Sequence, residues 1–452
     1  MASTDSKVLG VVVLVRHGDR HGFYQSPSTY TPSNTILTPL GNQQEFQLGQ
    51  KLRSLYLDPK SPDYISGINS TLVNDAQFRV RADAGGEGGV ILNSAQSLLQ
   101  GLYPANPGYN TTLANGTTIT GPLGGYQYIP IESVEPENDI SLEGWTSCNT
   151  FAIATKQFYE SPVFRQKAAE HDAFLKSLPP YLDGRPVTFE NMWNVFDFMN
   201  VQAMHNAEFL KALPPTYLTQ ARDLANWHEY GVFSDQKPDG IGNIPGHTIL
   251  APIIEGFHSI TNKDDPVKFV YQAISYKPFI SLFNLTGAAE ANPQLAGIVN
   301  FAASIAFEVR QPAAGGEPVL RLNFKNGTDD ADYKTYKFFN NTGSGTDVPL
   351  SQFIDYMEPL TVKTTAEWCG LCDNNKDRGC DALHLAAATG AHDARPKVSS
   401  IGAGFIGAGV TIALALAIIG FLVFLGVIGL GKSKRSKKGK DDNNDDSSEG
   451  KA

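Results

Sequence analysis

Positively charged residues are scarce in this chain of 452 residues. Lysine and arginine together number 36, against 46 aspartate and glutamate residues, which gives a formal net charge of −10 at pH 7. Residues 432–452 hold seven of the basic residues and five of the acidic ones, so the rest of the chain carries a net charge of −12. Proteins that bind nucleic acid need a basic face. The composition therefore excludes nucleic acid as an expected partner.

Cysteine is also rare, and a zinc site would need a further nearby ligand at standard spacing, which is not evident. A thioredoxin-like redox pair would open a helix after a strand, and the sequence around residues 369–372 does not indicate one. Disulfides are therefore the predicted use of these residues, and the sequence alone leaves all three pairings open. The four cysteines are Cys148, Cys369, Cys372 and Cys380.

No internal repeat and no low-complexity tract precedes the C-terminal tail, so a solenoid is not expected. The stretch 401–431 contains no charged residue and exceeds the roughly 20 apolar residues that span a bilayer. We predict one transmembrane helix there, after a stalk at residues 391–400. A basic and then acidic disordered tail follows at residues 432–452, and its basic part favours the cytoplasmic side.

A signal peptide is not recognisable, because the apolar run near the N-terminus leads into Arg16 without a cleavage site. Two topologies follow. Either a leader lies upstream of this sequence and the main domain is luminal or extracellular, or the C-terminal span is a tail anchor and the domain is cytosolic. The basic flank and the cysteines favour the first. Six glycosylation sequons agree with it: Asn69, Asn110, Asn115, Asn284, Asn326 and Asn340.

The most informative segment begins with an apolar run at residues 8–15, which is rich in β-branched residues and lacks a helical period. It predicts a buried strand, and chemistry in open α/β sheets gathers at the carboxyl ends of such strands. There the chain places His17 between Arg16 and Arg20. Two guanidiniums disfavour a metal cation but suit phosphate oxygens. The pattern predicts a phosphate site with an imidazole nucleophile.

The segment Arg16-His17-Gly18-Asp19-Arg20 resembles the signature of the histidine acid phosphatases, the phytase-like branch of the histidine phosphatase superfamily. The similarity continues through residues 37–53, which resemble the family's first helix, and through residues 94–104. It covers most of residues 8 to 390. It implies a phosphoglycerate-mutase-like α/β fold, in which helices flank a mostly parallel sheet. It further implies that His17 is phosphorylated, that Arg16 and Arg20 bind phosphate, and that no metal or organic cofactor takes part.

The sequence departs from the family pattern at two places. The family has a third phosphate-binding arginine, and the matching position here is occupied by Gly89-Val90. Arg81 is the alternative residue that could reach the phosphate. The family's His-Asp pair, whose Asp protonates the leaving alcohol, is replaced by Ser275-Tyr276-Lys277 after a predicted strand at residues 268–274. The candidate substitutes for this proton donor are Tyr276, Lys277, Glu87 and Asp83, and the sequence does not choose among them.

The domain organisation follows from these patterns. Residues 1–147 are predicted to form the first part of the α/β core, and residues 258–390 the remainder. Residues 148–257 read as helices joined by proline-marked turns and predict a helical cap insertion. Helices are expected at 163–178, 189–213, 219–231 and 279–287, and strands at 317–324 and 333–339.

Two functions from different classes remain open. The first is a membrane-anchored acid phosphomonoesterase that forms a phosphohistidine, with impaired or altered activity. The second is a catalytically inactive, membrane-anchored surface protein that binds phosphate or a phosphoester. The expected ligand in both is a phosphate monoester or free phosphate, and the oligomeric state is not predicted.

Overall fold

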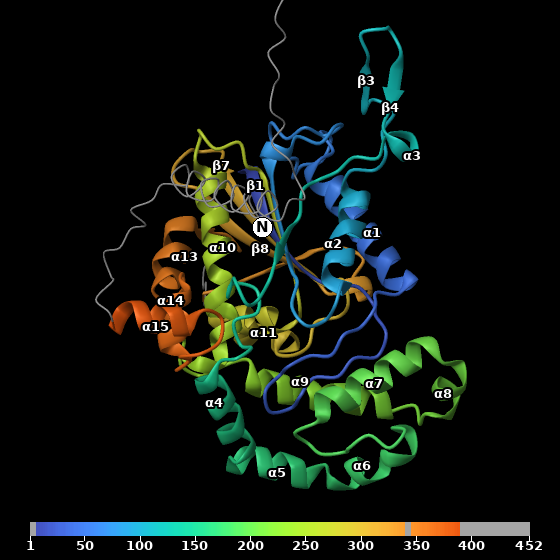
Figure 1. The fold of residues 1–452 in the computed structure, drawn as a ribbon, viewed down its shortest axis with the longest axis vertical. Helices are drawn as coiled ribbons and strands as arrows, with labels where there is room; N and C mark the ends of the chain where they lie inside the picture. Colours follow the sequence, from blue (N-terminus) through green and yellow to red (C-terminus); the bar gives the residue numbers. More distant parts are fainter. Residues whose placement is uncertain (1–5, 340–344, 389–452) are drawn as a thin grey trace, which may run out of the picture. The chain divides into compact units, whose positions relative to one another are not determined.

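The computed structural model describes residues 6–339 and 345–388. Helices cover both faces of a β-sheet in this part of the chain (Figure 1). The strands are β1 (Ser6–Arg16), β2 (Phe78–Asp83), β3 (Asn110–Thr112), β4 (Thr118–Thr120), β5 (Glu132–Val134), β6 (Phe269–Ile274), β7 (Ser304–Pro312), β8 (Val319–Lys325), β9 (Lys334–Tyr336) and β10 (Val348–Pro349). The helices are α1 (Pro39–Tyr56), α2 (Val90–Leu102), α3 (Pro122–Gly125), α4 (Asn149–Tyr159), α5 (Pro162–Glu170), α6 (Asp172–Ser177), α7 (Met192–His205), α8 (Ala207–Ala212), α9 (Tyr217–Val232), α10 (Ile244–Thr261), α11 (Lys277–Leu285), α12 (Ala288–Ala291), α13 (Leu350–Met357), α14 (Thr365–Leu371) and α15 (Cys380–Ala388).

The main sheet has the strand order β10-β8-β7-β1-β6-β2-β5, with β9 paired to β8. Strands β1, β6, β2 and β5 are parallel, whereas β7 runs antiparallel to β1, and β8 is antiparallel to its neighbours. The predicted α/β class is confirmed, but the expectation of a mostly parallel sheet is wrong because the sheet is mixed. Only residues 313–318 join β7 to β8, and so short a connection permits antiparallel pairing alone.

Strand β1 lies at the centre because its side chains are apolar in both directions. Val12 and Leu14 belong to the hydrophobic cluster that includes α10, and Val11 and Val13 belong to the cluster that includes α1 and α2. Burial on both faces explains the continuous β-branched run that predicted this strand. The carboxyl end of β1 is therefore held rigidly from both sides.

Helices α4 to α9 follow β5 in the chain and form the helical insertion (Figure 1). The last helix to begin before the predicted boundary at residue 257 is α10, which packs on the sheet, where a Cβ on Gly256 would lie 3.0 Å from Cγ2 of Val12. The predicted helix 189–213 is divided in two, since Oδ1 of Asn206 caps the amides of Glu208 and Phe209 and begins α8. The segment 163–178 is likewise divided, into α5 and α6.

All four cysteines form disulfides, as predicted. The structure pairs Cys148 with Cys372 and Cys369 with Cys380, which chooses among the three pairings that the sequence left open. The first bridge joins the start of α4 to the segment after α14, across 224 residues of sequence. It thereby fixes the beginning of the helical insertion to the end of the core.

Among residues 6–339 and 345–388, no helix is both long and apolar enough to cross a membrane. The predicted transmembrane segment 401–431, its stalk and the tail lie outside the described residues.

The predicted sequons differ in how their amides are used. Asn69, Asn110 and Asn115 are exposed. Nδ2 of Asn110 donates one hydrogen bond, to the carbonyl of Pro107, whereas Nδ2 of Asn284 donates two, to the carbonyl of Asp235 and to Asn243. Asn326 accepts a hydrogen bond from the amide of Asn300, and Asn340 lies outside the described residues.

Candidate active site

Three parallel strands of the sheet, β1, β6 and β2, end at the same edge, and the site residues follow them. His17 comes directly after β1, and Tyr276 and Lys277 come after β6. Asp83 closes β2, and Glu87 lies in the glycine-rich loop between β2 and α2. Parallel pairing therefore brings together residues that lie far apart in the sequence.

The loop that carries His17 is held by close backbone packing. A Cβ on Gly18 would lie 2.4 Å from the carbonyl oxygen of Gly41, and one on Gly41 would lie 2.1 Å from that of Asp19. Only glycine fits at both positions. The amide of Gly18 also donates to Oγ of Ser94, and that of Asp19 to Oε1 of Gln44. The residues that carried the family resemblance are thus the ones that fix this loop.

The imidazole of His17 is oriented by its own loop. Nδ1 lies 2.8 Å from the carbonyl oxygen of Gly18, and because a carbonyl only accepts, Nδ1 carries a proton. Nε2 is then the nitrogen whose lone pair is available in the neutral ring. His17 is 2% exposed, and burial lowers its pKa below the usual value, although Glu87 opposes this shift. The ring is therefore suited to act as a nucleophile in acid solution.

Glu87 lies directly in front of this nitrogen. Its Oε2 is 3.2 Å from Nε2 of His17, and both side chains are buried. This contact is an ion pair only when His17 is protonated, and Oε2 of Glu87 has no other hydrogen-bond partner within the described residues. Burial alone would raise the pKa of Glu87, but the charge and proximity of His17 lower it to about 2. An ionised carboxylate therefore faces the nucleophile, in the space that a phosphate would need.

The two arginines of the motif have different partners. Arg20 forms a bidentate pair with Asp197 of α7, at 3.0 and 3.1 Å. Arg16 donates from Nη1 to the carbonyl oxygen of Val299 and packs over the ring of Phe301. Burial and then the charge of Arg20 lower the pKa of Arg16 to about 10, so it remains a cation in acid. The positive charge of Arg20 is compensated, and that of Arg16 lacks a carboxylate partner in the described part of the chain.

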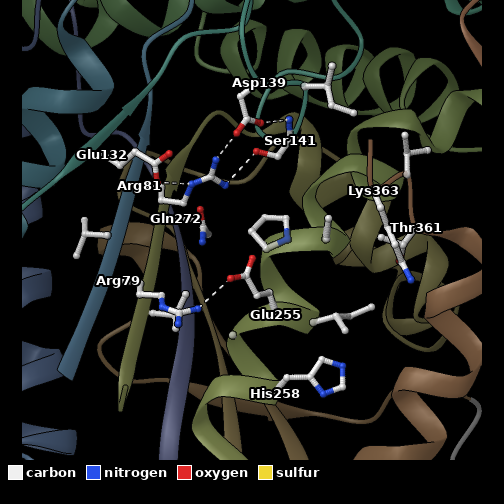
Figure 2. A pocket seen from close by; sticks show the side chains of 18 of the residues that line it. Arg79, Arg81, Glu132, Asp139, Ser141, Glu255, His258, Gln272, Thr361 and Lys363 are labelled. Atoms are coloured by element: carbon white, nitrogen blue, oxygen red, sulfur yellow. Dashed lines mark hydrogen bonds and ion pairs between the residues drawn. The ribbon is translucent and has the colours of Figure 1, made fainter. Parts of the chain in front are cut away.

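The structure does not bring Arg81 to His17. Figure 2 shows its guanidinium bound by Glu132, Asp139 and Ser141, beside a separate cavity of about 750 Å³. Arg79 and Arg81 share a face of β2, and both are paired with carboxylates at this cavity. Arg81 therefore belongs to an ion-pair network on the face of the sheet, away from His17.

Tyr276 is present at the site, but its hydroxyl proton is already used. The hydroxyl donates to Oε2 of Glu229 at 2.5 Å and accepts from Nε2 of Gln25 at 3.1 Å. Burial, with the charge of Glu229, raises its pKa well above the usual value. Tyr276 is a poor proton donor in this arrangement.

Lys277 is 1% exposed and lies at the first turn of α11, among carboxylates. Burial lowers the pKa of Lys277, whereas the charges of Glu87 and Glu143 oppose that shift. Asp83 and Glu143 both lie close to Gly85, because a Cβ there would be 3.0 Å from Oδ1 of Asp83 and 2.5 Å from Oε2 of Glu143. We call Asp83, Glu143 and Lys277 the buried proton cluster.

The two carboxyl groups of the buried proton cluster hold protons in acid solution. Burial raises the pKa of Asp83 to about 7, against the hydrogen bond from the amide of Gly85. Burial, together with the charge of Asp83, raises the pKa of Glu143 to about 8. Both carboxyls are protonated where an acid phosphatase would work, while Glu87 beside His17 is ionised.

Sequence reasoning did not find Asp197 or Glu143. Asp197 is flanked by Phe196 and Phe198 in a mainly apolar helix, and a carboxylate in such a setting indicates a buried cationic partner. That signal was present in the sequence. Glu143 lies in a segment without periodic structure, and no comparable signal marks it.

The comparisons with known proteins show the family of the chain. A family model for the histidine phosphatase superfamily (branch 2) matches residues 21–325. The chain belongs to this superfamily. Histidine phosphatases of the acid phosphatase group are similar to it over most of its length, which confirms the predicted family and, at the level of that family, a hydrolase of phosphate monoesters.

Three of these histidine phosphatases illustrate the similarity. Lysosomal acid phosphatase from Homo sapiens is 23% identical over 388 residues, with 81% of each chain covered. Testicular acid phosphatase from Homo sapiens is 24% identical over 348 residues, covering 72% of this chain and 74% of that one. The phytase of Klebsiella sp ASR1 matches the fold with a TM-score of 0.55 at 15% identity, over 80% of this chain and 98% of that structure.

Proposed function

We propose that this chain is an acid phosphomonoesterase that works through a phosphohistidine at residue 17. The observation that carries the proposal is the orientation of His17, whose Nδ1 is bound to the carbonyl of Gly18 while Nε2 faces the interior of the site. In the reaction, Nε2 would attack phosphorus and the bond from phosphorus to the ester oxygen would break. Water would then attack the phosphohistidine, releasing inorganic phosphate and regenerating the imidazole.

The leaving alcohol needs a proton, and we place it in the buried proton cluster. Lys277 interacts electrostatically with Glu87, which in turn contacts Nε2, so this cluster lies on the Nε2 side of the nucleophile. Asp83 and Glu143 are protonated in acid and can resupply the proton. Glu87 is less suited because its pKa lies near 2. General acid catalysis of this kind contributes roughly 10²- to 10⁴-fold.

The test of the proposed function is phosphate release from a panel of monoesters between pH 3 and 8, with rapid quenching in alkali to preserve phosphohistidine. We expect turnover in the acid part of this range and a phosphorylated peptide that contains residue 17. Folded protein that releases no phosphate and forms no adduct at residue 17 would refute the proposal.

Replacing Glu87 by alanine should strengthen the binding of inorganic phosphate by about 10-fold or more. The ionised carboxylate repels a phosphate dianion at contact distance, and like charges in a partly desolvated site interact by several kcal/mol. Titration calorimetry measures the change, and Glu255→Ala is the matched control because it removes an exposed carboxylate remote from His17. Weaker phosphate binding in Glu87→Ala would show that Glu87 assists the anion instead.

The same contact supports a second candidate function, a phosphate-binding protein without turnover. Glu87 contacts Nε2 of His17 and obstructs attack on phosphorus, whereas Arg16 has no carboxylate partner among the described residues and can bind an anion. If wild-type protein binds inorganic phosphate yet releases none from any monoester, this second function replaces the first.

We further propose that the domain lies on the luminal or extracellular side of a membrane. Two disulfides support an oxidising compartment. The uncharged segment 401–431, followed by basic residues, supports an anchor with a cytoplasmic tail.

A further inference from the structure

A small cavity of about 120 Å³ opens beside the motif, on the side of the helical insertion. Two cationic side chains line it, Arg16 from the end of β1 and Arg222 from α9. The ring of Phe301 also lines the cavity and lies 5.6 Å from the ring of His17, centroid to centroid. The cavity therefore adjoins the nucleophile.

The two guanidiniums are bound by consecutive residues of one backbone segment. Arg16 donates to the carbonyl oxygen of Val299. Arg222 donates to the carbonyl oxygen of Ile298 at 3.3 Å and to Oδ1 of Asn300. Since Val299 and Ile298 are consecutive, the backbone that positions one guanidinium also positions the other.

The two carboxylates that line this cavity are bound mainly by other side chains. Asp197 is bound bidentately to Arg20, and Asp329 accepts a hydrogen bond from Nδ2 of Asn300 while its charge also acts on Arg222. Within residues 6–339 and 345–388, no ion pair joins Arg16 or Arg222 to a carboxylate. Arg16 is 5% exposed, and its buried Nε has no hydrogen-bond partner in that part of the chain. Two guanidiniums without a directly paired carboxylate suit an anion in a small cavity, and planar N–H donors match phosphate oxygens.

We propose that Arg222 binds, together with Arg16, a phosphate group of the substrate in this cavity. The inference rests on the proposed function and deepens it, because it adds a substrate-binding residue from the helical insertion that no motif marks. The group bound there is either the reacting phosphate or a second phosphate of the same substrate. Both phosphate groups would be bound by the same guanidinium chemistry, and the experiment below distinguishes between them.

The test compares the full chain with Arg222→Gln and Arg222→Lys. Arg185→Gln is the matched control, since Arg185 is an exposed arginine of the same helical region that does not line the cavity. The readouts are the inhibition constant of inorganic phosphate and the KM values for 4-nitrophenyl phosphate and for fructose 1,6-bisphosphate. Because Arg222→Gln loses a charge-assisted hydrogen bond, we expect the affected constants to rise by about 10- to 100-fold. The constants of Arg222→Lys should lie between those of wild type and Arg222→Gln, because lysine keeps the positive charge but lacks the planar guanidinium.

The outcomes are distinct. If the KM values for both substrates and the inhibition constant of inorganic phosphate rise, Arg222 binds the reacting phosphate. If only the KM for fructose 1,6-bisphosphate rises, Arg222 binds a second phosphate. Unchanged constants in a variant that unfolds at the wild-type temperature overturn the inference. If wild-type protein shows no turnover, the proposed function fails by itself. Calorimetric binding of inorganic phosphate then decides this inference, which is supported if Arg222→Gln weakens binding and overturned if it does not.

Discussion

Alanine in place of His17 should lower the rate of phosphate release by about 10⁴-fold or more and abolish the trapped adduct. The size of this effect follows from the role of Nε2, because no other group near phosphorus supplies a nitrogen lone pair in the predicted reaction. In enzymes that form a covalent intermediate, loss of the nucleophile costs roughly as much as loss of the whole catalytic unit. Stopped assays of phosphate release at the pH of maximal rate measure it.

The matched control for this substitution is His171→Ala. His171 also precedes an aspartate in the sequence, but it lies between α5 and α6, and its substitution should leave the rate unchanged. Since His17 is buried, the variant should also be compared by thermal unfolding and by binding of inorganic phosphate. A folded His17→Ala protein that retains more than about a tenth of the wild-type rate would show that another residue attacks phosphorus.

The sequence predicted the part of the site that is encoded locally. The apolar run of β1, the motif that follows it and the glycines at positions 18 and 41 all act over short distances. A continuous β-branched run indicates a strand that is buried on both faces. A glycine in a tight loop indicates that another backbone segment approaches closely. The nucleophile and the edge of the sheet on which it lies could therefore be predicted from these local patterns.

The partners of the motif residues could not be predicted in the same way. Arg20 meets Asp197 across 177 positions of sequence, and Arg16 meets the carbonyl of Val299 across 283. Such contacts depend on how the helical insertion packs against the edge of the sheet, which no local pattern encodes. The prediction that both arginines bind phosphate treated them as equivalent, whereas the tertiary structure compensates the charge of Arg20 and leaves Arg16 without a carboxylate.

The same reasoning explains the place of Arg81. Its position on β2 was predictable from the sequence, and its face of the strand is shared with Asp83. What decides its role is the carboxylates of Glu132 and Asp139 (Figure 2). These residues belong to segments whose placement the sequence did not predict.

The buried proton cluster should make stability fall as pH rises, which is unusual for carboxyl groups. A group whose pKa is higher in the folded than in the unfolded protein binds more protons when folded. Asp83 and Glu143 have folded pKa values of about 7 and about 8, against roughly 4 in unfolded chains. Their contribution is therefore fully present below about pH 4 and is lost as pH rises through 7 to 8.

We expect the double variant Asp83→Asn, Glu143→Gln to gain about 4 kcal/mol in unfolding free energy relative to wild type between pH 4 and pH 8. One shift of about three pKa units corresponds to this amount, and because the two carboxyls interact, their effects do not add fully. Urea unfolding at several pH values measures the difference. The lowered pKa of His17 makes stability rise with pH over the lower part of this range. Because both proteins contain His17, the difference between them removes this effect.

The result also bears on catalysis, because the protons that stabilise the fold are the ones proposed to serve the leaving group. If Asp83 and Glu143 hold protons up to about pH 7, the alkaline limb of the activity profile lies close to neutrality, and the double variant should lose activity most where the wild type is most active. A difference in unfolding free energy that does not change with pH would mean that both carboxyls are ionised when folded. The proton for the leaving alcohol would then have to come from Lys277 alone.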